Sequence, residues 1–196
     1  MSRILVACEF SAIVRDAFRA LGHDAWSCDL LPCEGDNNFH LQENVVRPLV
    51  MEHWDTLIAF PPCTHLCVSG ARWFGGKLVQ QQQAIGFFMQ LANAPIHRIC
   101  IENPIGIMSS VWRKPDQIIQ PWQFGHGETK ATCFWLKNLP PLQPTHLKGD
   151  LFCEEAPKER RARVHLEPPG PDRWKNRSRT LDGVAKAMSQ HWGALL

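Results

Sequence analysis

The chain has 196 residues, of which 44% are apolar and 20% charged, and its net charge is only +2. These values are typical of a soluble globular protein with enough residues for one domain and a hydrophobic core. No apolar run approaches the roughly 18 residues that a membrane helix needs, and the N-terminus shows no signal peptide. We therefore expect a cytoplasmic protein without a membrane partner.

The chain contains eight cysteines. Several lie within apolar, strand-like runs and are typical of reduced, buried thiols. A disulfide framework would be unusual in a cytosolic chain of this length. Cys63, His65 and Cys67 lie close together, but the chain has no CxxC pair and this spacing matches no standard zinc pattern. We therefore expect no metal site.

Strands and helices alternate from the start of the chain. Residues 3–8 form a short apolar run that predicts a strand. Apolar residues at helical spacing follow over 13–21, and Gly22 ends that helix. Residues 25–28 indicate a second strand, with Asp29 at its carboxyl end. This order predicts the opening βαβ unit of a parallel sheet.

The same alternation continues for about 100 residues, which predicts one α/β domain with a mostly parallel sheet and helices on both faces. Residues 140–180 are rich in proline and charge and offer little regular structure. The remaining predicted elements are strands at 39–41, 56–60, 98–101, 118–124 and 132–136, and helices at 46–53, 77–93 and 182–191.

Polar segments stand where the predicted strands end, and ligands bind at that edge of an open parallel sheet. After the strand at 56–60, Pro61 and Pro62 stiffen the turn and would hold the Cys63 thiol at a fixed point. Glu102 ends the strand at 98–101. Taken singly, Cys63 is more often a plain buried cysteine, and Glu102 is as well explained as a cap or loop ligand.

Together these segments resemble motifs of the DNA cytosine-5 methyltransferases. Residues 54–70, an apolar strand followed by Pro-Cys and a later Ser-Gly, are similar to the Pro-Cys motif of that family. Residues 101–104 resemble its Glu-Asn-Val motif, and 124–134 resemble its Gln-x-Arg-x-Arg motif in frame. The order of the motifs is the family's. The chain as a whole resembles the compact phage and prophage branch, and residues 183–188 resemble the helix that closes the cofactor site.

The resemblance implies a Rossmann-like, adenosylmethionine-dependent methyltransferase and a covalent mechanism. Cys63 would add to carbon 6 of cytosine, which calls for a thiol with a lowered pKa. Glu102 would hold a proton near ring nitrogen 3, and Asn103 would support the loop. Lys130 and Thr132 stand where the family carries two arginines, and Glu128 stands where it carries glutamine.

The resemblance also implies a site for S-adenosylmethionine at the tips of the first strands. Asp29 would bind the ribose hydroxyls, and Glu43 would contact the adenine edge. The first motif of the family is rich in glycine, but this chain has none there. The remaining residues expected at the cofactor are Cys8, Glu9, Phe10, Ser11, Ala12 and Pro61.

One segment, residues 158–179, carries eight basic and three acidic residues, a net charge of +5 against −3 for the rest of the chain. It suits a nucleic acid backbone, although a solvated basic loop explains the charge equally well. The family's separate target-recognition domain has no room here, so this segment is all that is left to grip DNA. We expect it to lie outside the cofactor site and to bind DNA through Arg163, Arg173, Trp174, Lys175, Arg177 and Arg179.

We thus expect one methyltransferase domain over 1–196, with a catalytic core at 1–136, an irregular basic segment at 137–180 and a C-terminal helix at 181–196. Three alternatives stay open. The substrate could be a free pyrimidine nucleotide, since the recognition domain is missing. An amino-methyltransferase also uses two prolines after this strand, but it needs Asp or Asn before them. The third is a degenerate fold that only binds DNA. The sequence identifies no accessory partner.

Overall fold

A seven-stranded sheet organises the protein. The computed structural model describes residues 1–68, 75–146 and 157–196. The strand order is β3-β2-β1-β4-β5-β7-β6, with β1 to β5 parallel and β7 antiparallel to both of its neighbours. The strands are β1 (Arg3–Ala7), β2 (Asp24–Asp29), β3 (His40–Gln42), β4 (Thr56–Ala59), β5 (Arg98–Pro104), β6 (Gln117–Ile119) and β7 (Thr132–Lys137).

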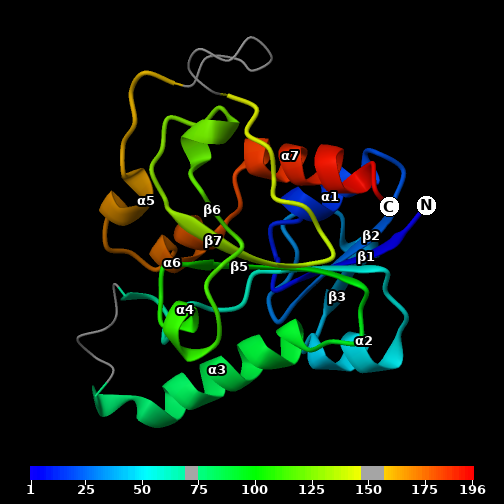
Figure 1. The fold of residues 1–196 in the computed structure, drawn as a ribbon, viewed down its shortest axis with the longest axis horizontal. Helices are drawn as coiled ribbons and strands as arrows, with labels where there is room; N and C mark the ends of the chain where they lie inside the picture. The colour runs from blue at the N-terminus through cyan, green and yellow to red at the C-terminus, as the bar shows by residue number, and fades with distance from the viewer. Residues whose placement is uncertain (69–74, 147–156) are drawn as a thin grey trace.

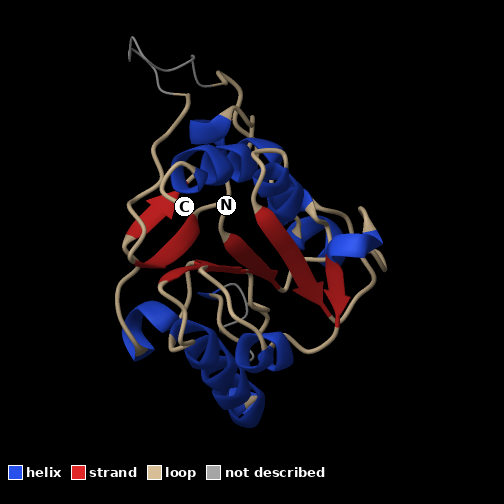
Figure 2. Ribbon diagram, turned by 90° about the vertical axis from the view of Figure 1, so that its right-hand side faces the viewer, coloured by secondary structure: helices blue, strands red, loops and turns tan. Residues whose placement is uncertain are grey.

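Helices cover both faces of the sheet (Figure 1). One face carries α1 (Ile13–Arg19) and α7 (Asp182–Gly193), and the other carries α2 (Val46–Met51), α3 (Leu78–Ala92) and α4 (Met108–Val111). The layered arrangement is plain when the molecule is turned by 90° (Figure 2). The prediction of a Rossmann-like α/β fold is confirmed. Two short helices, α5 (Arg163–Leu166) and α6 (Arg173–Ser178), lie between β7 and α7 in the chain.

The two apolar layers follow from the alternation of side chains along the strands. In β1, Ile4 and Val6 belong to the layer beneath α1 and α7, whereas Leu5 and Ala7 belong to the layer beneath α3. All four side chains are fully buried. A strand that is covered on both faces is apolar throughout, which is why the start of the chain reads as a continuous apolar run.

Two predicted elements differ from the structure. The strand expected at 118–124 ends at Ile119, and a 3-10 helix, η3 (Pro121–Phe124), follows. Pro121 cannot donate to a strand ladder, and the side chains of Gln120 and Gln123 form a reciprocal capping box around it. The segment expected to be irregular contains α5 and α6 in its described part, while residues 147–156 lie outside the described residues.

Gly106 joins two loops at the carboxyl edge of the sheet. The Ile107 amide donates to the Leu66 carbonyl at 2.8 Å, and the Val68 amide donates to the Ile105 carbonyl at 3.1 Å. A Cβ on Gly106 would lie 2.3 Å from the Leu66 oxygen, which belongs to the backbone and cannot swing aside. The loop after β5 therefore approaches the loop after β4 as closely as only glycine permits.

We expect Gly106→Ala to lower the free energy of unfolding by about 1–3 kcal/mol, since one loop has to move to admit the methyl group. Gly86 is a matched control. It lies at an exposed position of α3, where an added Cβ meets nothing within 4 Å. Gly86→Ala should raise stability by about 0.8–1 kcal/mol through helix propensity. Urea unfolding of both variants measures the difference, and an equal stability change in the two would contradict the close approach.

Candidate active site

The candidate active site lies where the parallel strands end. The strand β7 runs the other way, so its first residues reach the same edge that the last residues of β5 reach. The register pairs Asn103 with Cys133 and Pro104 with Thr132. Glu102, Asn103 and Thr132 are therefore brought together by a single strand pairing, although about 30 residues separate them in sequence.

The Cys63 loop is fixed from several directions. The Phe60 amide donates to the Ala7 carbonyl at 2.9 Å, which anchors the loop to β1. The side-chain amide of Asn103 donates to the Pro61 carbonyl at 2.8 Å. The Cys67 amide donates to the Cys63 carbonyl at 3.0 Å, which closes one helical turn after the cysteine. Asn103 thus contacts the loop that carries Cys63. Ser69 and Gly70 of the same motif lie outside the described residues.

The electrostatic environment of Cys63 differs from the expectation. Its thiol forms a hydrogen bond with Cys67, and this bond raises the pKa of Cys63 well above the usual value. Burial and the nearby Glu102 carboxylate raise the pKa further, while Lys130 lowers it. The protein without substrate therefore does not lower the pKa of Cys63 as expected, because a second thiol and a carboxylate both disfavour the thiolate.

Glu102 lies in surroundings that disfavour its charged form. Burial raises its pKa, and the charge of Lys130 opposes the rise. The Lys130 ammonium donates to the Arg177 carbonyl at 3.2 Å. The Thr132 hydroxyl donates to the Lys130 carbonyl at 3.0 Å, so its proton is already engaged.

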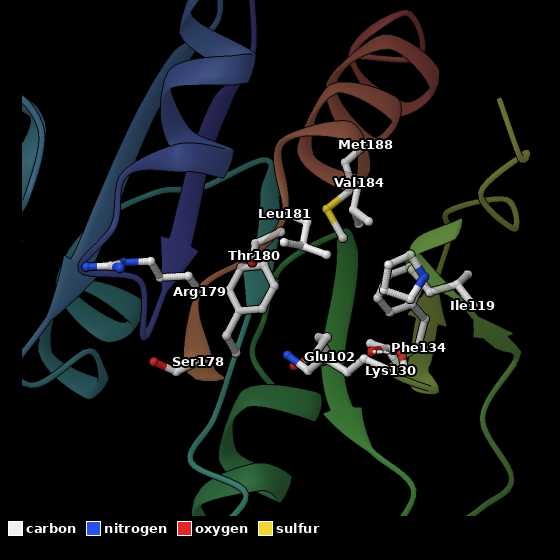
Figure 3. A pocket seen from close by; sticks show the side chains of 13 residues that line it. Glu102, Ile119, Lys130, Phe134, Ser178, Arg179, Thr180, Leu181, Val184 and Met188 are labelled. Atoms are coloured by element: carbon white, nitrogen blue, oxygen red, sulfur yellow. Dashed lines mark hydrogen bonds between the residues drawn. The ribbon is translucent and has the colours of Figure 1, made fainter. Parts of the chain in front are cut away.

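A pocket opens between β5, β7 and the start of α7 (Figure 3). Glu102, Lys130 and Thr132 line it together, so three of the residues expected from sequence share one cavity. Cys63 is not among its lining residues. On the opposite wall, we expected Arg179 at DNA and residues 183–188 at the cofactor, whereas no motif pointed to Ser178, Thr180 or Leu181. That wall is formed by Ser178, Arg179, Thr180, Leu181, Val184 and Met188.

The loop after β1 keeps a glycine-like backbone without glycine. Cys8 has a φ of 58° and Ala12 a φ of 64°, both in the left-handed region. The Glu9 carboxylate is buried and accepts the amides of Val14 at 2.7 Å and Arg15 at 3.2 Å. It therefore caps α1 from inside the loop, and burial raises its pKa to about 7. Ser11 lies within this cap, because its hydroxyl donates to Glu9 at 3.4 Å.

The two other acids expected at the cofactor lie at neighbouring strand tips. The amides of Cys8 and Glu9 both donate to the Cys28 carbonyl, which places Asp29 beside the first loop. One oxygen of Asp29 accepts the Leu31 amide at 2.9 Å. The Glu43 carboxylate instead forms an ion pair with Arg47 at 2.8 Å. Asp29 is thus at the tip of β2, whereas the charge of Glu43 is engaged by Arg47.

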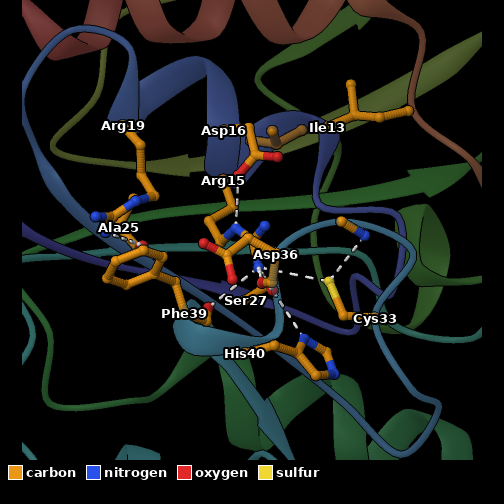
Figure 4. A network of polar contacts seen from close by, with 12 residues as sticks. Ile13, Arg15, Asp16, Arg19, Ala25, Ser27, Cys33, Asp36, Phe39 and His40 are labelled. Carbon is orange, nitrogen blue, oxygen red and sulfur yellow. Dashed lines mark hydrogen bonds and ion pairs between the residues drawn. The ribbon is translucent and has the colours of Figure 1, made fainter.

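A buried arginine that sequence reasoning missed shapes the loop after β2 (Figure 4). The Arg15 side chain is fully buried and donates to the carbonyls of Asp36 at 2.8 Å and Phe39 at 3.3 Å, and to the Ser27 hydroxyl at 3.2 Å. Its Nε donates to the neighbouring Asp16 at 2.7 Å. An arginine in a predicted amphipathic helix is expected to be exposed, so the sequence does not predict that Arg15 is buried and holds this loop.

The basic segment lies against the loop after β1, which corrects the expectation that it lies away from the strand tips. The rings of Trp174 and Phe10 are 6.2 Å apart, and the Lys175 ammonium is 5.4 Å from the centre of the Phe10 ring. Glu34, in the loop after β2, pairs with Lys175 at 3.2 Å and with Arg179 at 2.6 Å. The segment therefore folds back onto the strand-tip loops.

The other expected DNA-binding residues have distinct surroundings. Arg163 pairs with Glu128, whose side chain is only 8% exposed. Trp174 is 54% exposed despite its contact with Phe10. Among the described residues, Arg173 and Arg177 have no carboxylate partner. Within residues 1–68, 75–146 and 157–196, no group of three or more His, Cys, Asp or Glu side chains could hold a metal ion, and no helix is long and apolar enough to cross a membrane.

Comparison with known proteins supplies little beyond this geometry. No family model matches the chain, and no curated protein matches it. A solved structure from E. coli, described as a candidate DNA modification methyltransferase encoded within a prophage, is similar at 12% identity and a TM-score of 0.44. The match covers 69% of this chain and 46% of that chain, less than half of its length. The chain has a Rossmann-like α/β fold by its own strand order, and its activity, substrate and chemistry have to be inferred from the site.

The surroundings of Cys63 give a direct test. Cys67→Ala removes the thiol that contributes most to the raised pKa of Cys63, so the Cys63 thiolate should form at lower pH. We expect iodoacetamide to alkylate Cys63 faster at pH 8 in this variant than in the wild type, as measured by mass spectrometry. Cys33→Ala is the control and should leave the rate unchanged. An unchanged or slower rate in Cys67→Ala would show that another group holds the thiol protonated.

Proposed function

We propose that this chain is a single methyltransferase domain that transfers a methyl group from S-adenosylmethionine to carbon 5 of cytosine in DNA. One observation carries the proposal. The β5–β7 pairing brings Glu102, whose pKa is raised by burial, to one pocket with Lys130 and Thr132, and Asn103 bonds to the Cys63 loop. A thiol, a neutral carboxyl group and a cation are the groups that covalent activation of a pyrimidine requires.

In the proposed reaction, the Cys63 thiol loses its proton to solvent, and the thiolate sulfur forms a bond to carbon 6 while Glu102 gives its proton to ring nitrogen 3. The ring becomes an electron-rich enamine that accepts a methyl group at carbon 5. Solvent then takes the carbon 5 proton, the Cys63 sulfur leaves as the thiolate, and ring nitrogen 3 returns its proton to Glu102, which restores the aromatic ring. Adenosylmethionine supplies the methyl group as an electrophile bound to a positively charged sulfur.

The raised pKa values of the two groups fit together in this scheme. A neutral Glu102 can donate its proton, and in the same state it places no negative charge beside the Cys63 thiolate. Lys130 favours the thiolate through its own charge. Thr132, whose proton is engaged, can offer only its lone pairs to a base, so Lys130 is the donor available in place of the expected arginine pair.

The strand-tip loops fit adenosylmethionine better than a nucleotide cofactor with phosphates. Dinucleotide sites use the amides at a helix N-terminus to bind pyrophosphate. Here the Glu9 carboxylate already accepts two of those amides in α1, so a phosphate would meet both occupied donors and a carboxyl group. Adenosylmethionine has no phosphate. Asp29, at the tip of β2, has the position and chemistry to accept the ribose hydroxyls.

The reaction is tested with a labelled methyl donor and three substrates: duplex DNA, single-stranded DNA and dCMP. We expect label in DNA. DNA that contains 5-fluorocytosine should also form a complex that survives a denaturing gel, because the fluorine cannot leave carbon 5.

Cys63→Ser should abolish this complex, and Cys67→Ser is the matched control one helical turn away. Loss of the complex in Cys67→Ser but not in Cys63→Ser would show that Cys67, and not Cys63, is the nucleophile. Label in dCMP and none in DNA would identify a free-nucleotide enzyme instead.

The cofactor assignment has its own test. Asp29→Ala should weaken the binding of adenosylhomocysteine at least tenfold by calorimetry, since hydrogen bonds to a charged group are worth about 1.5–3 kcal/mol. Glu43→Gln should change the affinity much less, because Glu43 forms its ion pair with Arg47. Unchanged affinity in Asp29→Ala would remove Asp29 from the site.

A further inference from the structure

The helix α6 presents basic residues on two opposite faces. At 3.6 residues per turn, Arg173 and Arg177 lie roughly 40° apart, while Lys175 lies roughly 200° from Arg173. Lys175 faces the loop after β2 and pairs with Glu34 at 3.2 Å. Arg179, which directly follows the helix, binds the same carboxylate through two nitrogens, at 2.6 and 3.0 Å.

Glu34 thereby joins the C-terminal segment to the strand-tip loops. Lys175 also lies near the Phe10 ring, and the Trp174 ring contacts the same ring from α6. On the other side, the Arg177 carbonyl accepts the Lys130 ammonium at 3.2 Å. In Figure 3 the Arg179 guanidinium points away from Glu102 and Lys130, in keeping with its bond to Glu34. One short helix thus touches both the cofactor side and the base side of the site.

The opposite face of α6 is free of such pairing. Within the described part of the chain, the side chains of Arg173 and Arg177 form no ion pair, and the Nε of Arg173 is shielded from solvent without a hydrogen-bond partner. An arginine side chain without a carboxylate partner keeps its charge available for an anion. Phosphate oxygens match the planar donors of arginine.

We infer that Glu34 sorts the basic residues of this segment: Lys175 and Arg179 clamp α6 onto the cofactor loops, and Arg173 and Arg177 bind the phosphates of DNA. The inference rests on the proposed function for the identity of its two ligands, DNA and the cofactor. It narrows the DNA-binding set expected from sequence and gives two members of that set, Lys175 and Arg179, a positioning role. Glu34 itself is a positioning residue that acts through these two cations.

The test compares two double variants that each remove two charges. We measure the affinity for duplex DNA by fluorescence anisotropy over a range of salt concentrations. Arg173→Gln/Arg177→Gln should flatten the slope of log affinity against log salt by about 1.8, at about 0.9 for each phosphate contact. Lys175→Gln/Arg179→Gln should flatten it by less than half as much. Equal losses in the two double variants would overturn the sorting.

Glu34→Gln gives a prediction of opposite sign for the two ligands. It frees Lys175 and Arg179, so DNA should bind more tightly and with a steeper salt slope. Adenosylhomocysteine should bind about threefold to fivefold more weakly, the scale of a partly exposed ion-pair network of about 1 kcal/mol. Glu52→Gln is the matched control, because it removes an ion pair with Arg3 at the other end of the sheet and should change neither affinity. Parallel weakening of both ligands in Glu34→Gln would contradict the inference.

Hydrogen exchange separates this inference from the proposed function. The amides of residues 173–178 should exchange faster in Glu34→Gln and stay unchanged in Glu52→Gln, whether or not any ligand binds. If the wild-type protein binds neither adenosylhomocysteine nor DNA, the proposed function fails, together with the phosphate role of Arg173 and Arg177. Unchanged exchange in Glu34→Gln would overturn the clamp while leaving the methyltransferase proposal intact.

Discussion

The antiparallel pairing of β7 with β5 is the constraint on which the candidate site depends. In a sheet made only of parallel strands, the start of each strand lies at the edge opposite to the ligands. Because β7 runs against β5, residues 130–132 arrive at the carboxyl edge beside Glu102. The pairing also fixes Asn103, which ties β5 to the Pro61 carbonyl. A slip of β7 by one residue would turn Thr132 to the other face of the sheet, away from Glu102, and dismantle the pocket.

Two groups at the candidate site have raised pKa values for different reasons. Burial is the main cause for Glu102, and the hydrogen bond with Cys67 is the main cause for Cys63. Under the proposed function, a raised pKa favours the proton-donor form of Glu102, and the Cys63 thiolate has to form beside Lys130 when the base is bound.

The sequence predicted what depends on local pattern and motif order. The strand–helix alternation predicted the sheet, and the motifs brought Glu102, Lys130 and Thr132 to one pocket. It could not predict interactions between segments that no pattern links. Arg15 sits in a predicted amphipathic helix, and its burial depends on carbonyls in the loop at 36–39. Glu34 lies in an irregular loop, and its partners follow more than 140 residues later. The strand expected after Gln117 stops early because of Pro121.

The absence of glycine in the first motif has a physical explanation in Glu9. Glycine-rich turns let a backbone approach a phosphate, and this chain has no phosphate to accommodate if its cofactor is adenosylmethionine. The space and the amides are used by a buried carboxyl group that caps α1 from within, while Cys8 and Ala12 hold the left-handed backbone. The loop is thus fixed by its own side chains. Phe10 lies in this fixed loop and packs against Trp174 and Lys175 of α6. The buried cap at Glu9 therefore also positions the basic helix.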